Sequence, residues 1–212
     1  MHVPSREYAE ACAKEFNIDI KKFIVTTFGL HDTYNLWKDT TVEYKDYALA
    51  IGRSNRDYDF LIKTWKKLPV ENKLVIICDQ YKANEKLPDN IILRDNIIGN
   101  KQFPYIMNCK LMIIPIKEGN ICSGDTVLLK AMSYCKTVVV TKPSTLAEMY
   151  IKDGENGICI EKDEEKFAKV ISDLMCDEIK LDEIGKRARK AFVDNFSRYT
   201  MGKKIGEILK EN

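Results

Sequence analysis

Two kinds of segment alternate along the chain: short apolar, β-branched runs, and longer stretches in which apolar residues recur every three or four positions. The first pattern predicts buried strands and the second predicts amphipathic helices. The expected strands are 23–27, 47–51, 73–78, 90–93, 110–114, 137–141 and 157–160. The expected helices are 5–16, 57–68, 125–134, 144–151, 163–175, 181–195 and 199–210.

Most of these strands are apolar throughout and are followed by a helix, which is typical of a parallel sheet covered on both faces. The sequence therefore predicts an α/β protein with a doubly wound parallel sheet, Rossmann-like in architecture. Ligands of such folds bind at the carboxyl ends of the strands, near the topological switch point. The loops to inspect are 52–56, 79–83, 95–101 and 117–125.

Composition narrows the classes of function. The 45% hydrophobic and 31% charged residues are typical of a folded globular protein, and the net charge of +2 argues against a dedicated nucleic-acid binder. No apolar run has the length of a membrane span, and the first residues lack the apolar core of a signal peptide. The seven cysteines have no Cys-x-x-Cys spacing, so we expect a cytoplasmic chain without structural zinc.

The loop 52–57 contains the first candidate site. Gly52 permits a tight exit from the strand, and Arg53 and Arg56 lie near the start of a helix. The planar guanidinium fork of arginine is suited to binding phosphate oxygens in pairs. The alternative is that both arginines are solvated, with Asp57 serving only as the helix cap.

The second candidate is the turn formed by Ser123, Gly124, Asp125 and Thr126. Small residues at a helix start expose backbone N–H groups and the positive end of the helix dipole, which favours a phosphate. The helix that follows is apolar on nearly all sides, so its start is expected to form the floor of a pocket. The alternative is a buried helix capped by Asp125 without a ligand. Asp125 would repel a phosphate unless its carboxylate turns away.

Two other patterns carry less chemistry. Asp57-Tyr58-Asp59 has a spacing that holds a metal in some transferases, but here it opens a helix and is expected to cap it. The Asp-Gly and Asn-Gly pairs within 153–157 predict turns and need no function. We expect no metal site.

Several segments in order resemble the C-terminal domain of retaining glycosyltransferases with the GT-B fold, of the large bacterial group 1 type. They are Gly52-Arg53 with Arg56, Leu129-Lys130-Ala131-Met132, Val138-Val139-Val140, Glu148 to Gly157, and Phe196-Ser197. The resemblance covers about 47–196. It implies a nucleoside-diphosphate sugar as donor substrate, no other cofactor, and transfer of the sugar with retention of configuration to a glycan or lipid-linked acceptor.

The resemblance also implies which residues bind the donor. The base would lie near the backbone of the loop after the fourth predicted strand. The expected nucleotide-sugar-binding residues are Arg53, Arg56, Ser123, Gly124, Asp125, Thr126, Lys130, Asn96 and Ile97.

Two positions depart from the family pattern. Where the family has two glutamates eight positions apart, this chain has Cys122 and Lys130. The second glutamate normally accepts hydrogen bonds from ribose hydroxyls, which an ammonium group cannot do, although it could meet a phosphate. Cys122 cannot replace the first glutamate, so Glu118 is the candidate catalytic residue, with Asp125 as the other carboxylate within reach.

Domain organisation is the second departure. We expect 1–45 to be a remnant of a preceding domain plus a linker, 46–197 the nucleotide-sugar-binding domain, and 198–212 a C-terminal helix. GT-B enzymes bind the acceptor in an N-terminal domain, which would here be missing or a separate subunit. The alternatives are a catalytically inactive interaction module that partners a transferase subunit, and a fragment of a longer enzyme. The basic cluster 186–190 suggests peripheral contact with the inner membrane face, although such runs are more often solvated.

Overall fold

The computed structural model describes residues 1–3 and 6–211 and divides the chain into two compact units. One unit comprises Met1–Asp32 and Ala191–Asn212, and the other comprises Thr33–Lys190. The expected boundaries after residues 45 and 197 differ from this division. It groups 33–45 with the larger unit and 191–197 with the N-terminal residues.

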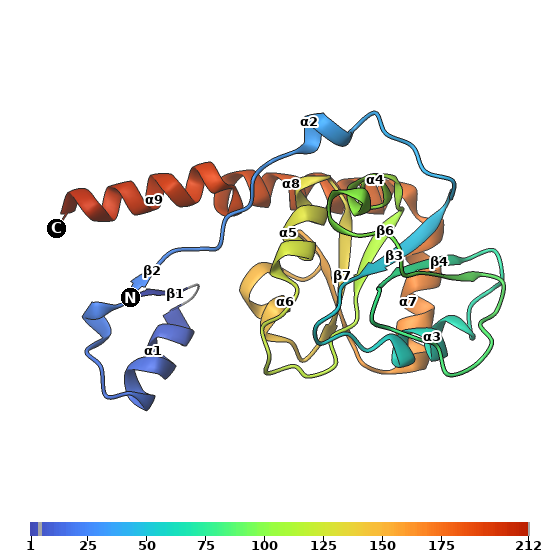
Figure 1. Ribbon diagram of the computed structural model, residues 1–212, viewed down its shortest axis with the longest axis horizontal. Coiled ribbons are helices and arrows are strands. Elements are labelled where there is room, and N and C mark those ends of the chain that lie inside the picture. The colour runs from blue at the N-terminus through green and yellow to red at the C-terminus, as the bar shows by residue number, and fades with distance from the viewer. Residues whose placement is uncertain (4–5, 212) are drawn as a thin grey trace. The chain divides into compact units, whose positions relative to one another are not determined.

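The larger unit is built on a six-stranded parallel sheet with the order β5-β4-β3-β6-β7-β8 (Figure 1). Its strands are β3 (Tyr47–Ile51), β4 (Lys73–Ile77), β5 (Ile91–Arg94), β6 (Leu111–Ile114), β7 (Thr137–Lys142) and β8 (Ile158–Glu161). The chain moves outward from β3 to β5, then returns to the other side of β3 with β6. The topological switch point therefore lies between β3 and β6, and the predicted fold class is confirmed.

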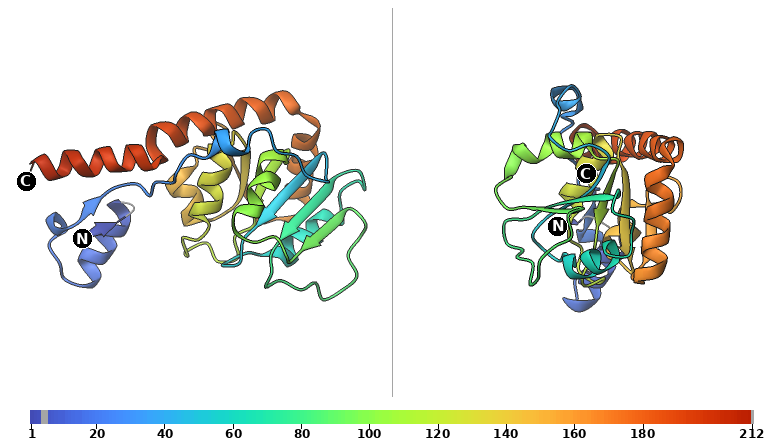
Figure 2. Two further views of the ribbon diagram at one scale, coloured as in Figure 1. Left: turned by 45° about the horizontal axis from the view of Figure 1, so that its top comes forward. Right: turned by 90° about the vertical axis from the view of Figure 1, so that its right-hand side faces the viewer.

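Helices cover both faces of this sheet (Figure 2). On one face α3 (Tyr58–Trp65) packs with α7 (Glu164–Cys176), and the rings of Phe60 and Phe167 meet edge to face at 5.4 Å between centroids. On the other lie α4 (Phe103–Asn108) and α5 (Asp125–Ser133). All five residues of β3 are buried, as expected for a central strand covered on both sides.

Three further α-helices belong to this part of the chain. They are α2 (Tyr34–Trp37), α6 (Thr145–Tyr150) and α8 (Glu178–Ala191), the last of which ends at the boundary between the units. The sequence did not predict α2 or α4, because helices of four and six residues are too short to display a helical period. Within the part of the chain that the structure describes, no helix is long and apolar enough to cross a bilayer.

The smaller unit contains a parallel strand pair, β1 (His2–Val3) and β2 (Ile24–Val25), connected through α1 (Arg6–Glu15). Its C-terminal part has a π-helical turn at Phe192–Phe196, where an ordinary helix was expected, followed by α9 (Arg198–Glu211). The two parts are joined at Leu30, whose N–H donates to the carbonyl of Phe196 at 2.9 Å. This unit therefore combines residues from both ends of the chain.

Candidate functional site

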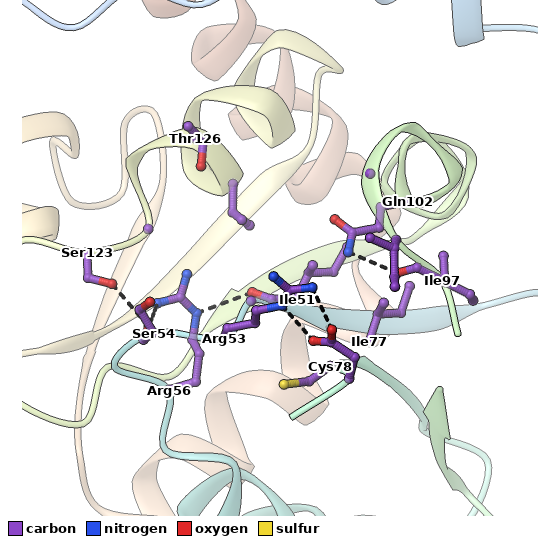
Figure 3. Close-up of a pocket in the computed structure, with 16 residues that line it drawn as sticks. Ile51, Arg53, Ser54, Arg56, Ile77, Cys78, Ile97, Gln102, Ser123 and Thr126 are labelled. Carbon is purple, nitrogen blue, oxygen red and sulfur yellow. Dashed lines mark hydrogen bonds and ion pairs between the residues drawn. The ribbon is translucent and has the colours of Figure 1, made fainter. Parts of the chain in front are cut away.

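A cavity of about 460 Å³ lies at the carboxyl ends of β3 and β4, beside the start of α5 (Figure 3). Its walls are formed by residues 51–54, 56, 77–79, 97–99, 102, 123, 124, 126 and 127. This is the position that the switch-point rule assigns to ligands of doubly wound folds. Of the residues predicted from the sequence, the cavity brings together Arg53, Arg56, Ser123, Gly124, Thr126 and Ile97.

Arg56 is held by backbone carbonyls at one side of the cavity. Its Nε donates to the carbonyl of Ile51 at 3.2 Å, and its Nη1 donates to the carbonyl of Ser54 at 2.8 Å. Burial lowers the pKa of this guanidinium from its ordinary value. The Nη2 group takes part in neither bond, so one edge of a fixed cation remains for a ligand.

Two glycines make room for Arg56. A Cβ atom at Gly52 would lie 2.9 Å from Nε of Arg56, and one at Gly124 would lie 2.7 Å from its Nη2. Both glycines also have positive φ, +130° and +113°, a conformation that side chains with a Cβ rarely adopt. The end of β3 and the start of α5 therefore lie closer to the guanidinium than residues with a Cβ atom could.

Asn55 joins the two loops that form this part of the cavity. Its Nδ2 donates to the carbonyls of Glu118 at 2.9 Å and Ile121 at 3.3 Å, and its Oδ1 accepts from the N–H of Glu118 at 2.8 Å. The hydroxyl of Ser123 adds a bond to the carbonyl of Ser54 at 3.0 Å. The loops 52–57 and 117–126 therefore hold each other in place without a ligand.

Arg53 lies on the same side of the cavity but is paired with a carboxylate. Its Nε and Nη2 donate to the two oxygens of Asp79, at 2.6 and 2.5 Å. These hydrogen bonds raise the pKa of Arg53 and lower the pKa of Asp79. Asp79 was not among the predicted site residues, although it is the first residue of a loop that follows a strand's carboxyl end.

The start of α5 forms another wall of the cavity. Gly124 is the N-cap, and Thr126 and Val127 line the cavity from the first turn, where backbone N–H groups have no partner within the helix. Asp125 faces elsewhere: its Oδ1 accepts from the hydroxyl of Tyr150 at 2.8 Å and from the Cys122 thiol at 3.5 Å. The condition for an anion site, that this carboxylate turns away, is met. Burial and Asp125 together raise the pKa of Cys122 to about 12.

Lys130 lies outside the cavity. Its side chain is buried against Thr33, Phe103 and Tyr134. Its Nζ donates to the Thr33 hydroxyl at 3.2 Å and lies 4.9 and 5.6 Å from the ring centroids of Phe103 and Tyr134. More than one turn along α5, this side chain meets α4 and the segment before β3. In this arrangement Lys130 does not face the cavity in which a phosphate is expected.

Two other predicted residues also lie outside the cavity walls. Asn96 is exposed, while its neighbour Ile97 lines the cavity and is fixed by a bond from Gln102 Nε2 to its carbonyl at 3.0 Å. Glu118, the candidate catalytic residue, contributes its backbone to Asn55 and has an exposed side chain. Among the described residues that line the cavity, Asp79 is the one carboxylate.

Residues 45–177 match the model of the family described as Glycosyl transferases group 1. The chain belongs to this family. The match includes the whole sheet and every residue that lines the cavity. No curated protein gives a significant match.

Solved structures agree with the family in fold. The Anabaena protein HepE, crystallised with UDP-glucose, has a TM-score of 0.79 and 16% identity, with 100% of this chain and 63% of HepE covered. A glycosyltransferase from Rickettsia africae has a TM-score of 0.81 and 18% identity, with coverages of 99% and 62%. WaaG, a glycosyltransferase involved in lipopolysaccharide biosynthesis, has a TM-score of 0.72 and 16% identity, with coverages of 98% and 61%.

These findings confirm the expected resemblance to the C-terminal domain of GT-B-fold glycosyltransferases. The chain spans less than two thirds of each of these structures. In this group 1 domain, the residues at 1–3 and 6–211 include no group of three or more His, Cys, Asp or Glu that could hold a metal ion. As expected, Asp57 caps α3, accepting from the N–H of Phe60 at 3.0 Å.

Proposed function

We propose that this chain is the donor-binding domain of a glycosyltransferase that moves a sugar from a nucleoside-diphosphate sugar to a glycan or lipid-linked acceptor. The observation that carries the proposal is the cavity at the switch point, whose walls include Arg56 and the first turn of α5. Family membership and the UDP-glucose bound by HepE support it. UDP is accordingly the first nucleotide to test.

In this proposal the diphosphate lies between Arg56 and the start of α5. The free edge of the guanidinium and the first N–H groups of the helix face the phosphate oxygens, and the hydroxyl of Thr126 adds a donor. Negative charge grows on the diphosphate as the bond to the sugar breaks. Donors that are already fixed stabilise that charge without reorganisation, and they do so without a metal ion.

The remaining donor contacts follow from the other walls. The base would lie against Ile97 and Ile98, whose loop is held by the bond between Gln102 and the Ile97 carbonyl. Arg53 completes the anion side. Asn96, Glu118, Asp125 and Lys130 are not assigned donor contacts, because their side chains do not line the cavity.

The acceptor would be bound by an N-terminal acceptor domain, in the same polypeptide or in a separate subunit. The cytoplasm is the proposed location. For the basic cluster, Lys186 pairs with Asp182 at 2.5 Å, Arg187 donates to the carbonyl of Glu155, and Arg189 donates to the carbonyl of Ser133. Since these cations have partners within the chain, we propose no membrane contact through them.

Calorimetric titration with UDP, GDP and ADP, each in EDTA, tests donor binding. We expect saturable binding of at least one nucleotide, and a loss of about ten- to a hundredfold in Arg56→Gln, because hydrogen bonds to a charged group are removed. Arg187→Gln is the matched control, since Arg187 does not line the cavity, and should bind as the unaltered chain does. Failure of a folded chain to bind any of the three would sink the proposal.

A second candidate is an inactive interaction module that partners a transferase subunit. It is favoured by one observation: neither Glu118 nor Asp125 lies in the cavity, so neither candidate carboxylate faces the donor. The same titration separates the two functions. A module without a donor site predicts a chain with a cooperative melting transition, no nucleotide binding and no response of that transition to nucleotide.

A further inference from the structure

The cavity has one carboxylate among the described residues of its walls, that of Asp79. It is paired with Arg53, one of the two arginines that would bind the diphosphate. Asp79 contributes to the wall, and 25% of its side-chain surface and 50% of that of Arg53 are exposed. The bidentate bonds occupy Nε and Nη2 of Arg53, so Nη1 is not part of the pair. The charge of Arg53 is therefore balanced by Asp79, while Nη1 remains available to a ligand.

Arg56 has different partners. The two bonds that hold it go to carbonyl oxygens, which fix its geometry without forming an ion pair, although the Asp125 carboxylate outside the cavity interacts with it electrostatically. The anion side of the cavity thus carries the charge of Arg56, the helix start, and a neutral Arg53–Asp79 pair. A ligand with more negative charge gains less there than it would beside two uncompensated arginines.

The substrate and product of a sugar transfer differ in this respect. In a nucleoside-diphosphate sugar both phosphates are esterified, leaving two negative charges. The free nucleoside diphosphate has a terminal phosphate whose second ionisation lies near about pH 6, so it carries nearly one more charge above about pH 7. A carboxylate in the cavity therefore repels the product more strongly than the donor.

We propose that Asp79 is a specificity-determining residue that favours the nucleotide sugar over the free nucleoside diphosphate and so promotes release of the product. This inference rests on the proposed function of the cavity. Asp79 acts as an internal competitor: it offers Arg53 a carboxylate in place of the terminal phosphate. The effect depends on charge, so it disappears when the terminal phosphate is protonated.

The test compares UDP and UDP-glucose, or the corresponding GDP or ADP pair if one of those binds in the survey above. Calorimetry in EDTA would give both affinities for the unaltered chain and for Asp79→Asn. At about pH 8 we expect Asp79→Asn to tighten UDP about tenfold more than UDP-glucose. At about pH 5 this difference should shrink toward zero, since the two ligands then carry similar charge.

A matched control and a second variant guard against indirect effects. Asp59→Asn removes a carboxylate on α3 that accepts from the Tyr81 hydroxyl and does not line this cavity, so it should leave the ratio of the two affinities unchanged. Arg53→Gln leaves Asp79 uncompensated and should weaken UDP more than UDP-glucose. Melting curves establish that each variant is folded.

The outcomes are distinct. Equal weakening of both ligands by Asp79→Asn would show that Asp79 only positions Arg53, and unchanged affinities would show that it plays no part; either overturns the inference and leaves the donor site standing. If the unaltered chain binds neither ligand, the proposed function fails together with the inference. Selective tightening of UDP that persists undiminished at about pH 5 would also contradict the charge argument.

Discussion

Arg56 and Lys130 show two ways in which this domain holds a partly or fully buried cation. Arg56 is fixed by carbonyl oxygens between two glycines and lines a cavity. Lys130 meets the Thr33 hydroxyl and the rings of Phe103 and Tyr134, outside that cavity. Carbonyl oxygens and glycines leave an edge of the cation open, whereas bulky rings enclose it. The first environment is suited to a ligand and the second to packing.

The largest effect on the open environment of Arg56 is expected from a substitution at Gly124. In Gly124→Ala the new Cβ would lie 2.7 Å from Nη2 of Arg56, with φ at +113°. We expect a loss of about 2–4 kcal/mol of unfolding free energy and at least about tenfold weaker nucleotide binding, since both strain and clash act at the cavity. Urea unfolding and calorimetry measure the two effects.

Gly154→Ala is the control for Gly124→Ala. Gly154 has a φ of +75°, and an added Cβ atom would meet nothing within 4 Å, so this substitution reports the backbone cost alone. It should destabilise the domain by about 1 kcal/mol and leave nucleotide affinity unchanged. Equal effects of the two substitutions would contradict the role assigned to Gly124 as the space beside Arg56.

Lys130→Met tests the second environment, in which the cation is enclosed by aromatic rings. It removes the bond to Thr33 and the cation–π contacts while keeping much of the side-chain volume. Because these contacts are lost, we expect the unfolding free energy to fall by about 1–2 kcal/mol. The nucleotide affinity should stay within about twofold of that of the unaltered chain. A loss of affinity comparable to that of Arg56→Gln, in a folded variant, would place Lys130 in the donor site after all.

The smallest effect is expected beside the cavity, at Cys122. Burial and the neighbouring Asp125 raise the pKa of this thiol to about 12, so it reacts slowly as a nucleophile at neutral pH. Asp125→Asn should lower that pKa and speed alkylation of Cys122 by iodoacetamide severalfold. Tyr150→Phe is the control, because it removes a bond to Asp125 but keeps the negative charge. Peptide mapping by mass spectrometry follows the modification, and an unchanged rate in Asp125→Asn would contradict this account.

Much of the sheet could be predicted because each buried strand is visible in the sequence as a short apolar run, as in β3 and β6. The cavity's position followed from the order of strands and helices, and Arg56 and the turn at Ser123 were found by their place after strands. The contacts around Lys130 could not be predicted from local sequence patterns. It depends on α4, a helix too short to show a period, and on Thr33, which is 97 positions away from Lys130.

Other partnerships escaped sequence reasoning for the same physical reason. The pair of Arg53 and Asp79 joins the ends of two adjacent parallel strands, and Asn55 bonds to a loop more than sixty positions further along the chain. Arginine, aspartate and asparagine are all ordinary residues in loops of this kind. What gives each its role is the register of β3 against its neighbours, which brings their carboxyl ends to one level.

Asn55 has a consequence for how this loop can change over evolutionary time. It recognises residues 118 and 121 through their main chain alone, so the grip does not depend on which side chains those positions carry. Gly119 is constrained, since a Cβ there would lie 2.4 Å from the carbonyl oxygen of Pro143. The exposed side chains at 118, 120 and 121 can therefore change, in evolution or by design, while the backbone hydrogen bonds that tie this loop to Asn55 are kept.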